Sequence, residues 1–218
     1  MDPAEIYPEL ERQKIDAERL AKQCIHWPEF VPVLIGGLAH EKARVKYGCA
    51  KALRILSDER PDLLYSDFEF FAGLLDHRNK IFQWEAIYVL AGLASADQER
   101  KLDQMLDKYF APIEGRVMIT ANNVIKGAIR IALAKPYLAD DIVKRILRVQ
   151  KARYETAECF EITCGAALKA FEELFSLVSD SKPLLRFARA HVDSPRNATR
   201  KVAEKFLGDH TQRERVLA

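Results

Sequence analysis

The chain has 218 residues, of which 49% are hydrophobic and 30% are charged, and its formal net charge is +2. This balance is typical of a folded domain with a sizeable core, and nine glycines with nine prolines are too few for a sandwich or barrel of many tight turns. A net charge this small does not by itself indicate a polyanionic partner. Evidence for such a partner must come from how the charges are distributed.

The first residues, MDPAEIYPELERQ, lack the basic and then apolar run of a signal peptide, and charges interrupt every apolar stretch well before about 18 residues. We therefore expect a cytoplasmic protein without a membrane segment. The four cysteines, Cys24, Cys49, Cys159 and Cys164, lie within apolar helical patterns. We expect them to be reduced, and at least three of them to be buried.

Helical periodicity runs through nearly the whole chain. Asp2, Pro3 and Glu5 form a typical helix start, and Pro8 interrupts it, so the first regular helix is predicted over 8–25. Later caps are predicted at Ser66 with Glu69, Ser95 with Gln98, and Ser194 with Pro195. The later helices are predicted over 28–39, 41–57, 67–75, 79–94, 96–110, 115–135, 139–149, 157–178, 182–192 and 195–208. No segment alternates with the period of a strand, so the predicted fold class is all-α.

These helices form pairs, and the second helix of each pair repeats along the chain. When the 79–94 helix is shifted by 37 residues back or 35 forward, its small residue falls on a small residue of another helix. Its large residue, four positions later, then falls on a large one. The aligned pairs are Cys49 with Leu53, Ala86 with Leu90, Ala121 with Ile125, Ala167 with Phe171, and Ala203 with Leu207. A small residue lets two helices approach, and a large one fills the groove between pairs. Repeats of this length are typical of a stacked helical solenoid.

The segment LLDHRNKIFQWEAIYVLAGLA at 74–94 resembles a HEAT repeat, as does HVDSPRNATRKVAEKFLG at 191–208. Asp76 and Asp193 match the family's turn aspartate, Pro195 its proline, Ile81 its apolar entry, and Arg200 lies near its frequent arginine. The other three units depart from the turn pattern. The resemblance implies an α-α superhelix (a HEAT-like solenoid) of about five antiparallel helical pairs, within a single domain over 1–218. Its parts are expected to be a capping helix in 1–27, repeats over 28–208 and a tail over 209–218.

In such a solenoid the second helices line the concave surface, and residues opposite the core positions point into it. The candidate partner-binding residues are Tyr47, Lys51, Arg54, Trp84, Tyr88, Asn123, Lys126, Arg130 and Lys169. The full columns, which also include Arg44, Arg116, Ile119, Lys201 and Lys205, hold nine bases and one acid, Glu172. Glu85, Glu173 and Glu204 lie beside them. The columns are either a solvated lysine-rich face or a basic groove with aromatic residues for an acidic protein segment or a nucleic acid.

No catalytic constellation or cofactor site is predicted. Cys159 and Cys164 lie about 140° apart around a helix, which is unsuited to one metal ion. The glycines of IGGLA follow no strand and precede no lysine-serine pair, so they do not form a phosphate loop. Asn122 and Asn123, in an apolar helix, are either an asparagine ladder between repeats or a ligand contact.

Two functional hypotheses follow from the resemblance, whose family consists mostly of scaffolds that bind proteins. The first is a non-enzymatic, monomeric scaffold that binds a protein partner through its concave face. The alternative is a nucleic-acid-binding protein, similar in fold to the HEAT-like DNA glycosylases. Only two tryptophans are present, Trp27 and Trp84, so no catalytic residue of those enzymes is carried over. A continuous positive groove would favour nucleic acid, and a groove interrupted by Glu85, Glu173 and Glu204 would favour protein.

Overall fold

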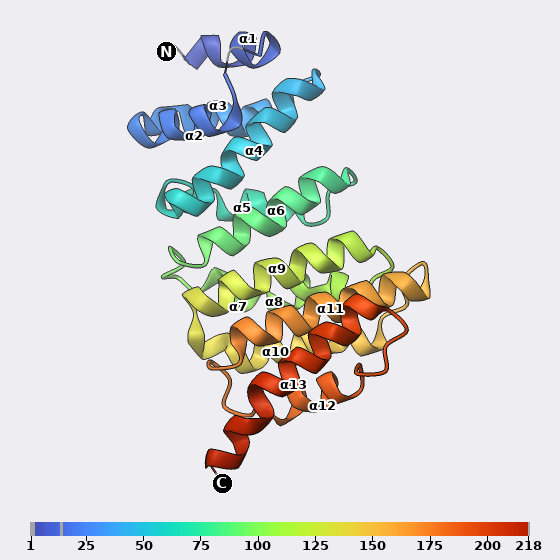
Figure 1. The fold of residues 1–218 in the computed structure, drawn as a ribbon. Helices are drawn as coiled ribbons and strands as arrows, with labels where there is room; N and C mark the ends of the chain where they lie inside the picture. The colour runs from blue at the N-terminus through green and yellow to red at the C-terminus, as the bar shows by residue number, and fades with distance from the viewer. Residues whose placement is uncertain (1–2, 14, 218) are drawn as a thin grey trace. The chain divides into compact units, whose positions relative to one another are not determined.

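The computed structural model describes residues 3–13 and 15–217, with side chains through His210. Every regular element in these residues is a helix, which confirms the predicted all-α fold class. By its internal contacts the chain divides into two compact units, Met1–Leu102 (unit 1) and Asp103–Ala218 (unit 2), and each is described by itself. Figure 1 labels the helices in chain order.

Unit 1 consists of stacked helical layers. Its α-helices are α1 (Ile6–Glu11), α2 (Ala17–His26), α3 (Val31–Gly37), α4 (Ala43–Glu59), α5 (Phe68–Leu74) and α6 (Lys80–Leu93). The helices α3 and α4 pack as one pair and α5 and α6 as the next, while α2, α4 and α6 contact one another in succession. The second helices therefore form one layer and the first helices another.

Unit 2 repeats this arrangement. The short α7 (Lys101–Gln104) crosses the unit boundary, followed by α8 (Leu106–Phe110), α9 (Met118–Ala134), α10 (Ala139–Ile146), α11 (Ala157–Leu174), α12 (Lys182–Arg189) and α13 (Asn197–Leu217). The helices α9, α11 and α13 form the second-helix layer, because α11 contacts both α9 and α13. Gly165 allows the close approach of α11 to α13, since a Cβ there would lie 2.9 Å from the Thr199 Oγ1 atom.

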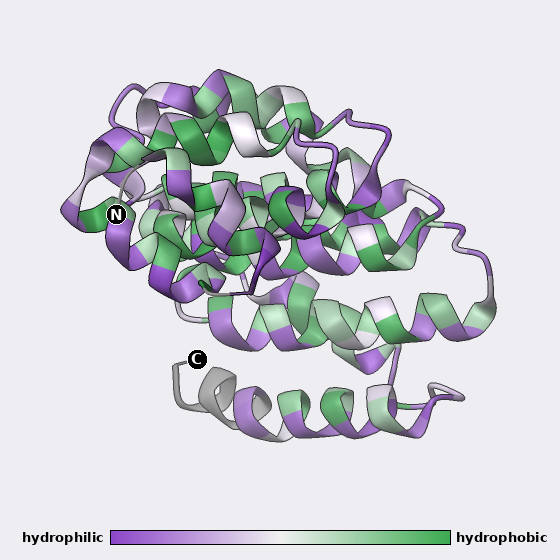
Figure 2. Ribbon diagram, turned by 90° about the horizontal axis from the view of Figure 1, so that it is seen from above, coloured by the Kyte–Doolittle hydropathy of each residue, from purple (hydrophilic) through white to green (hydrophobic). Residues whose placement is uncertain are grey.

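The small and large residues of the aligned second helices form the core. Cys49, Ala86, Ala121, Ala167 and Ala203 are all at most 1% exposed, as predicted. The large partners Leu53, Leu90, Ile125 and Phe171 are equally buried, but Leu207 is half-buried, and the neighbouring Phe206 occupies the core instead. Figure 2 shows how hydrophobic and hydrophilic residues alternate along the helices.

Hydrogen bonds between residues about one repeat apart join successive second helices. In unit 1, the Asn79 amide donates to the Tyr47 hydroxyl over 3.1 Å, 32 residues away in sequence. In unit 2, the Thr199 hydroxyl donates to the backbone oxygen of Glu161 over 2.8 Å, 38 residues away. These bonds connect α4 to the start of α6 and α11 to α13.

The predicted helix over 8–25 is wrong as one element, since α1 ends at Glu11 and α2 begins at Ala17. Gln13 adopts a positive φ of 58°, which no helical residue has, and the Asp16 carboxylate caps α2 by accepting from the Arg19 backbone N–H over 2.8 Å. Of the predicted start, Asp2 lies outside the described residues. At the other end, α13 continues to Leu217 through most of the expected tail.

Two of the three predicted later caps are also wrong. The Ser66 hydroxyl donates to Asp67, and α5 has no side-chain cap. The Ser95 hydroxyl donates to the Gly92 carbonyl, and the predicted helix over 96–110 is divided into α7 and α8. The cap of α7 is the buried Asp97, whose carboxylate accepts from the backbone N–H groups of Lys101 and Leu102 over 2.8 and 3.0 Å. The Ser194 hydroxyl does accept from a backbone N–H before α13, that of Arg196, over 3.2 Å.

Candidate partner-binding faces

The second-helix layer of unit 1 carries five of the predicted binding residues on two contacting helices. These five residues, Tyr47, Lys51 and Arg54 on α4 with Trp84 and Tyr88 on α6, together with Glu85 on α6, form what we call the α4–α6 face. Lys51 is exposed, and the aromatic side chains and Arg54 are half-buried. Neither Trp84 nor Tyr88 is fully buried between repeats, so both rings remain accessible to a partner.

Arg54 is held in place from two sides. Its Nη1 atom lies 3.4 Å from the Glu85 Oε1 atom, and its guanidinium lies 5.4 Å from the centre of the Tyr88 ring. Burial raises the pKa of Glu85, against the opposing effect of Arg54 and Lys51, and the second Glu85 oxygen is buried and accepts no hydrogen bond from the part of the chain that the structure describes. Burial also raises the pKa of Tyr88. The Arg54 guanidinium therefore has a cation–π contact with Tyr88 and an ionic contact with Glu85, and the two contacts together hold it in position.

Tyr47 contacts residues at and near the start of α6. Its hydroxyl accepts from the Asn79 amide, and its ring lies 5.9 Å from that of Phe82. Asn79 is the cap of α6, accepting from the Ile81 backbone N–H over 3.0 Å. Tyr47 therefore positions the start of α6, where the other aromatic residues of the face lie.

In unit 2, the exposed side of α9 carries three more of the predicted residues. We call this set the α9 stripe: Ile119, Asn123, Lys126, Arg130 and Leu133. Lys126 is exposed, Asn123 and Arg130 are half-buried, and Ile119 and Leu133 are large apolar residues with exposed fractions of 48% and 56%. Beside the stripe, the Asn122 Oδ1 atom is buried and accepts no hydrogen bond from the described residues. Both interpretations of the two asparagines stay open.

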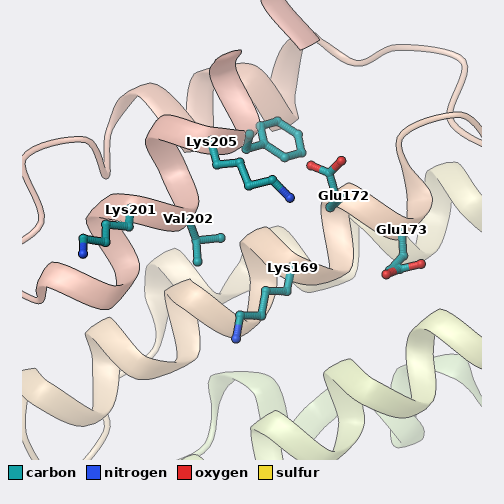
Figure 3. A pocket seen from close by; sticks show the side chains of 7 residues that line it. Lys169, Glu172, Glu173, Lys201, Val202 and Lys205 are labelled. Atoms are coloured by element: carbon teal, nitrogen blue, oxygen red, sulfur yellow. The ribbon is translucent and has the colours of Figure 1, made fainter. Parts of the chain in front are cut away.

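The last predicted residue, Lys169, lines a pocket between α11 and α13. We call it the α11–α13 pocket; its volume is about 410 Å³, and its lining is Lys169, Glu172, Glu173, Lys201, Val202, Lys205 and Phe206. Figure 3 shows Lys169 and Lys201 toward one end of the pocket and the two glutamates toward the other. Its charges are therefore mixed, as in the α4–α6 face.

A buried histidine contacts Glu172, one of the residues that line this pocket. His210 is only 4% exposed; its ring stacks on Phe175 with centroids 3.7 Å apart, and its Nε2 atom lies 3.1 Å from the Glu172 Oε2 atom. The sequence interpretation placed His210 in the tail and missed this contact. Its spacing of 38 residues from Glu172, close to the repeat length, was the available signal.

Comparisons with known proteins support the architecture but not a family. No protein-family model matches the chain, and no curated protein matches it. Among solved structures, a designed armadillo repeat protein matches with a TM-score of 0.58 at 14% identity, covering 94% of this chain and 92% of that one. An engineered protein of the Northeast Structural Genomics Consortium matches with a TM-score of 0.57 at 16% identity, covering 96% and 90%.

The chain has an α-solenoid fold. The likeness is to armadillo-type repeats, so the HEAT assignment stays a resemblance of two segments. Within residues 3–13 and 15–217, none of the helices combines the length and the apolar character that crossing a membrane requires.

The described side chains form no cluster of three or more histidine, cysteine, aspartate or glutamate residues that could hold a metal ion. Cys24, Cys49 and Cys164 are buried, Cys159 is half-buried, and none of the four forms a disulfide. Burial raises the pKa of each of the three buried thiols to about 12. At neutral pH these groups are therefore protonated and poor nucleophiles.

Proposed function

We propose that the chain is a non-enzymatic α-solenoid scaffold that binds a protein partner through the exposed sides of its second helices. The observation that carries this proposal is the α4–α6 face, where Trp84, Tyr88 and Arg54 lie together at the surface and Glu85 fixes the guanidinium. Tryptophan, tyrosine and arginine dominate binding hot spots. A side chain already held in position loses less conformational entropy on binding, which favours affinity.

The distribution of charge favours a protein over a nucleic acid as the partner. Binding to a phosphate backbone is driven by cations that neutralise successive phosphates. In the α4–α6 face, Glu85 pairs with one of the cations, and in the α11–α13 pocket Glu172 and Glu173 lie among three lysines. The α4–α6 face and the α11–α13 pocket therefore each offer a mixed set of charges around aromatic or apolar groups, which suits a folded or peptide partner of defined sequence.

Affinity capture from a lysate of the source organism tests the proposal. The bait is the wild-type chain, compared with a variant in which Lys51, Lys126 and Arg130 are each replaced by glutamate. We expect the wild type to retain a specific protein after nuclease treatment and the triple variant to lose it. Reversal of exposed helix charges changes folding stability by only a few tenths of a kcal/mol per residue, so the variant should fold.

The matched control reverses three exposed lysines outside the second helices, Lys144, Lys151 and Lys182, which changes the net charge by the same amount. This control should capture the partner as the wild type does. Capture that disappears with nuclease would instead support the nucleic-acid alternative. Equal loss in both triple variants would contradict the assignment of binding to the second helices.

A further inference from the structure

The helix α9 has an unusual composition for a surface helix. Its 17 residues, MITANNVIKGAIRIALA, include Lys126 and Arg130 but no aspartate or glutamate. The neighbouring second helix α11 carries Glu158, Glu161 and the two pocket glutamates. The positive charge of α9 is therefore not balanced by acids of the same helix, unlike that of its neighbour.

The exposed residues of α9 lie along one line. Ile119, Lys126 and Leu133 follow one another at intervals of seven residues, and seven residues complete nearly two turns of an α-helix. Arg130 lies four residues after Lys126 and so projects from the same side. The line from Ile119 to Leu133 covers 14 residues, or roughly 21 Å at 1.5 Å per residue.

Both ends of this line are apolar and uncovered. Ile119 and Leu133, at 48% and 56%, are two of the six large hydrophobic residues that are exposed in the described part of the chain. Single exposed apolar residues are common, but two on one line with cations between them form a patterned surface. The pattern along α9 is apolar, basic, basic, apolar.

We propose that the α9 stripe docks an acidic partner segment that carries an apolar side chain at each end. This inference rests on the proposed function and names the class of partner for one of its faces. Carboxylates of the segment pair with Lys126 and Arg130, while its apolar side chains cover Ile119 and Leu133. An extended segment covers roughly 21 Å with about seven residues at 3.3 Å per residue, and alternate side chains face the helix. Residues 1, 3, 5 and 7 of such a segment therefore meet α9.

A designed peptide tests this chemistry directly. The probe is the synthetic peptide Leu-Ser-Glu-Ser-Glu-Ser-Leu, titrated into the full-length chain while the methyl and amide resonances are followed by NMR. We expect the methyl resonances of Ile119 and Leu133 to shift. The dissociation constant should rise at least tenfold when both glutamates of the peptide are replaced by lysine, and also when both leucines are replaced by serine.

The protein variants locate the site. The variant Lys126→Glu/Arg130→Glu should bind the probe at least tenfold more weakly, whereas the charge-matched Lys144→Glu/Lys151→Glu control should bind it as the wild type does. Circular dichroism establishes that both variants are folded. A wild type that binds the lysine peptide as well as the acidic one, or that does not bind the acidic peptide, overturns the proposal.

Failure of this inference is separable from failure of the proposed function. Lys51→Glu/Trp84→Ala changes the α4–α6 face and leaves the α9 stripe intact, so it should still bind the probe. If this variant loses the partner captured from lysate while the wild type ignores the acidic peptide, the scaffold function stands and the partner class proposed for α9 is wrong. If the wild type binds the acidic peptide selectively but captures no protein, the α9 chemistry stands and the scaffold function is wrong.

Discussion

Removal of the Asp103 carboxylate should destabilise unit 2 strongly, because that carboxylate pairs with the buried ammonium group of Lys135. The Lys135 side chain is only 5% exposed and the Asp103 side chain 14%. The Lys135 Nζ atom lies 3.1 Å from the Asp103 Oδ1 atom. The Tyr137 hydroxyl also donates to this carboxylate, over 3.0 Å, and accepts from Lys135 over 3.1 Å. The three side chains join the helix that begins unit 2 to the end of α9.

The expected magnitude follows from this burial. Breaking a buried ion pair by truncating one partner costs roughly 3–5 kcal/mol, whereas replacing both partners by apolar residues is often nearly neutral. We therefore expect Asp103→Ala to lose about 3–5 kcal/mol, and the double variant Asp103→Leu/Lys135→Met to lose much less. For a chain of this size, about 2–4 °C per kcal/mol gives a fall in Tm of roughly 6–20 °C for the single variant.

Guanidinium unfolding followed by far-UV circular dichroism measures these differences. Both tryptophans, Trp27 and Trp84, lie in unit 1, so tryptophan fluorescence reports on unit 1 in the same samples. The circular dichroism transition should move by the expected amount for Asp103→Ala. A single variant as stable as the wild type, or a double variant as unstable as the single one, would refute the assignment of a stabilising buried pair.

Three further predictions concern the core, the thiols and one carboxyl group. Leu90→Ala and Phe171→Ala, at fully buried positions, should each cost roughly 2–5 kcal/mol in denaturant unfolding, and unchanged midpoints would mean that these columns are not core. A maleimide at neutral pH should label Cys159 first and leave the buried Cys164 unmodified until unfolding; mass spectrometry reads the order. Because burial raises the folded-state pKa of Glu85, the folded chain binds that proton more tightly than the unfolded chain. Lowering the pH from neutral toward the ordinary glutamate range should therefore stabilise the wild type relative to Glu85→Gln in parallel unfolding curves, and a constant difference would contradict it.

The parts of the fold that could be predicted from sequence are those that repeat. Helical periodicity and the recurrence of a small residue before a large one identified the buried columns, since both depend only on local spacing. The last core position was wrong by one residue: Leu207 was predicted to be buried, but Phe206 is. The repeat pattern alone cannot decide which of two adjacent apolar residues on a helix faces the core.

The caps and breaks were less predictable because tertiary contacts decide them. Ser95 and Asp97 are both plausible caps by residue type, but only Asp97 also accepts a hydrogen bond from Tyr65, over 2.7 Å, from 32 residues away. The turn at Gln13 contains neither a glycine nor a proline at that position, so the local signal for the start of α2 was its capping residue, Asp16.

For the candidate faces too, the sequence predicted what depends on spacing within one helix and not what depends on contacts between helices. Helical spacing was sufficient to select Lys51, Trp84 and Lys126 as residues outside the core columns. It could not show that Arg54 pairs with Glu85, because that partner lies on the next repeat. Helical spacing also could not predict that Leu133 is exposed while Ile131 is buried, because exposure depends on which helices pack against α9. Whether the faces of the two units act as one contiguous surface stays a prediction.

Amine footprinting of the complex with the captured partner tests binding through the second helices most directly. The chain is acetylated briefly with and without its partner, and mass spectrometry measures the modification of each lysine. Lys51, Lys126 and Lys169 are exposed on α4, α9 and α11, while the control lysines Lys144, Lys151 and Lys182 are exposed outside the second helices. The account predicts that the partner protects the first three and leaves the control lysines as reactive as in the isolated chain. Protection of the control lysines, with Lys51, Lys126 and Lys169 unchanged, would contradict it.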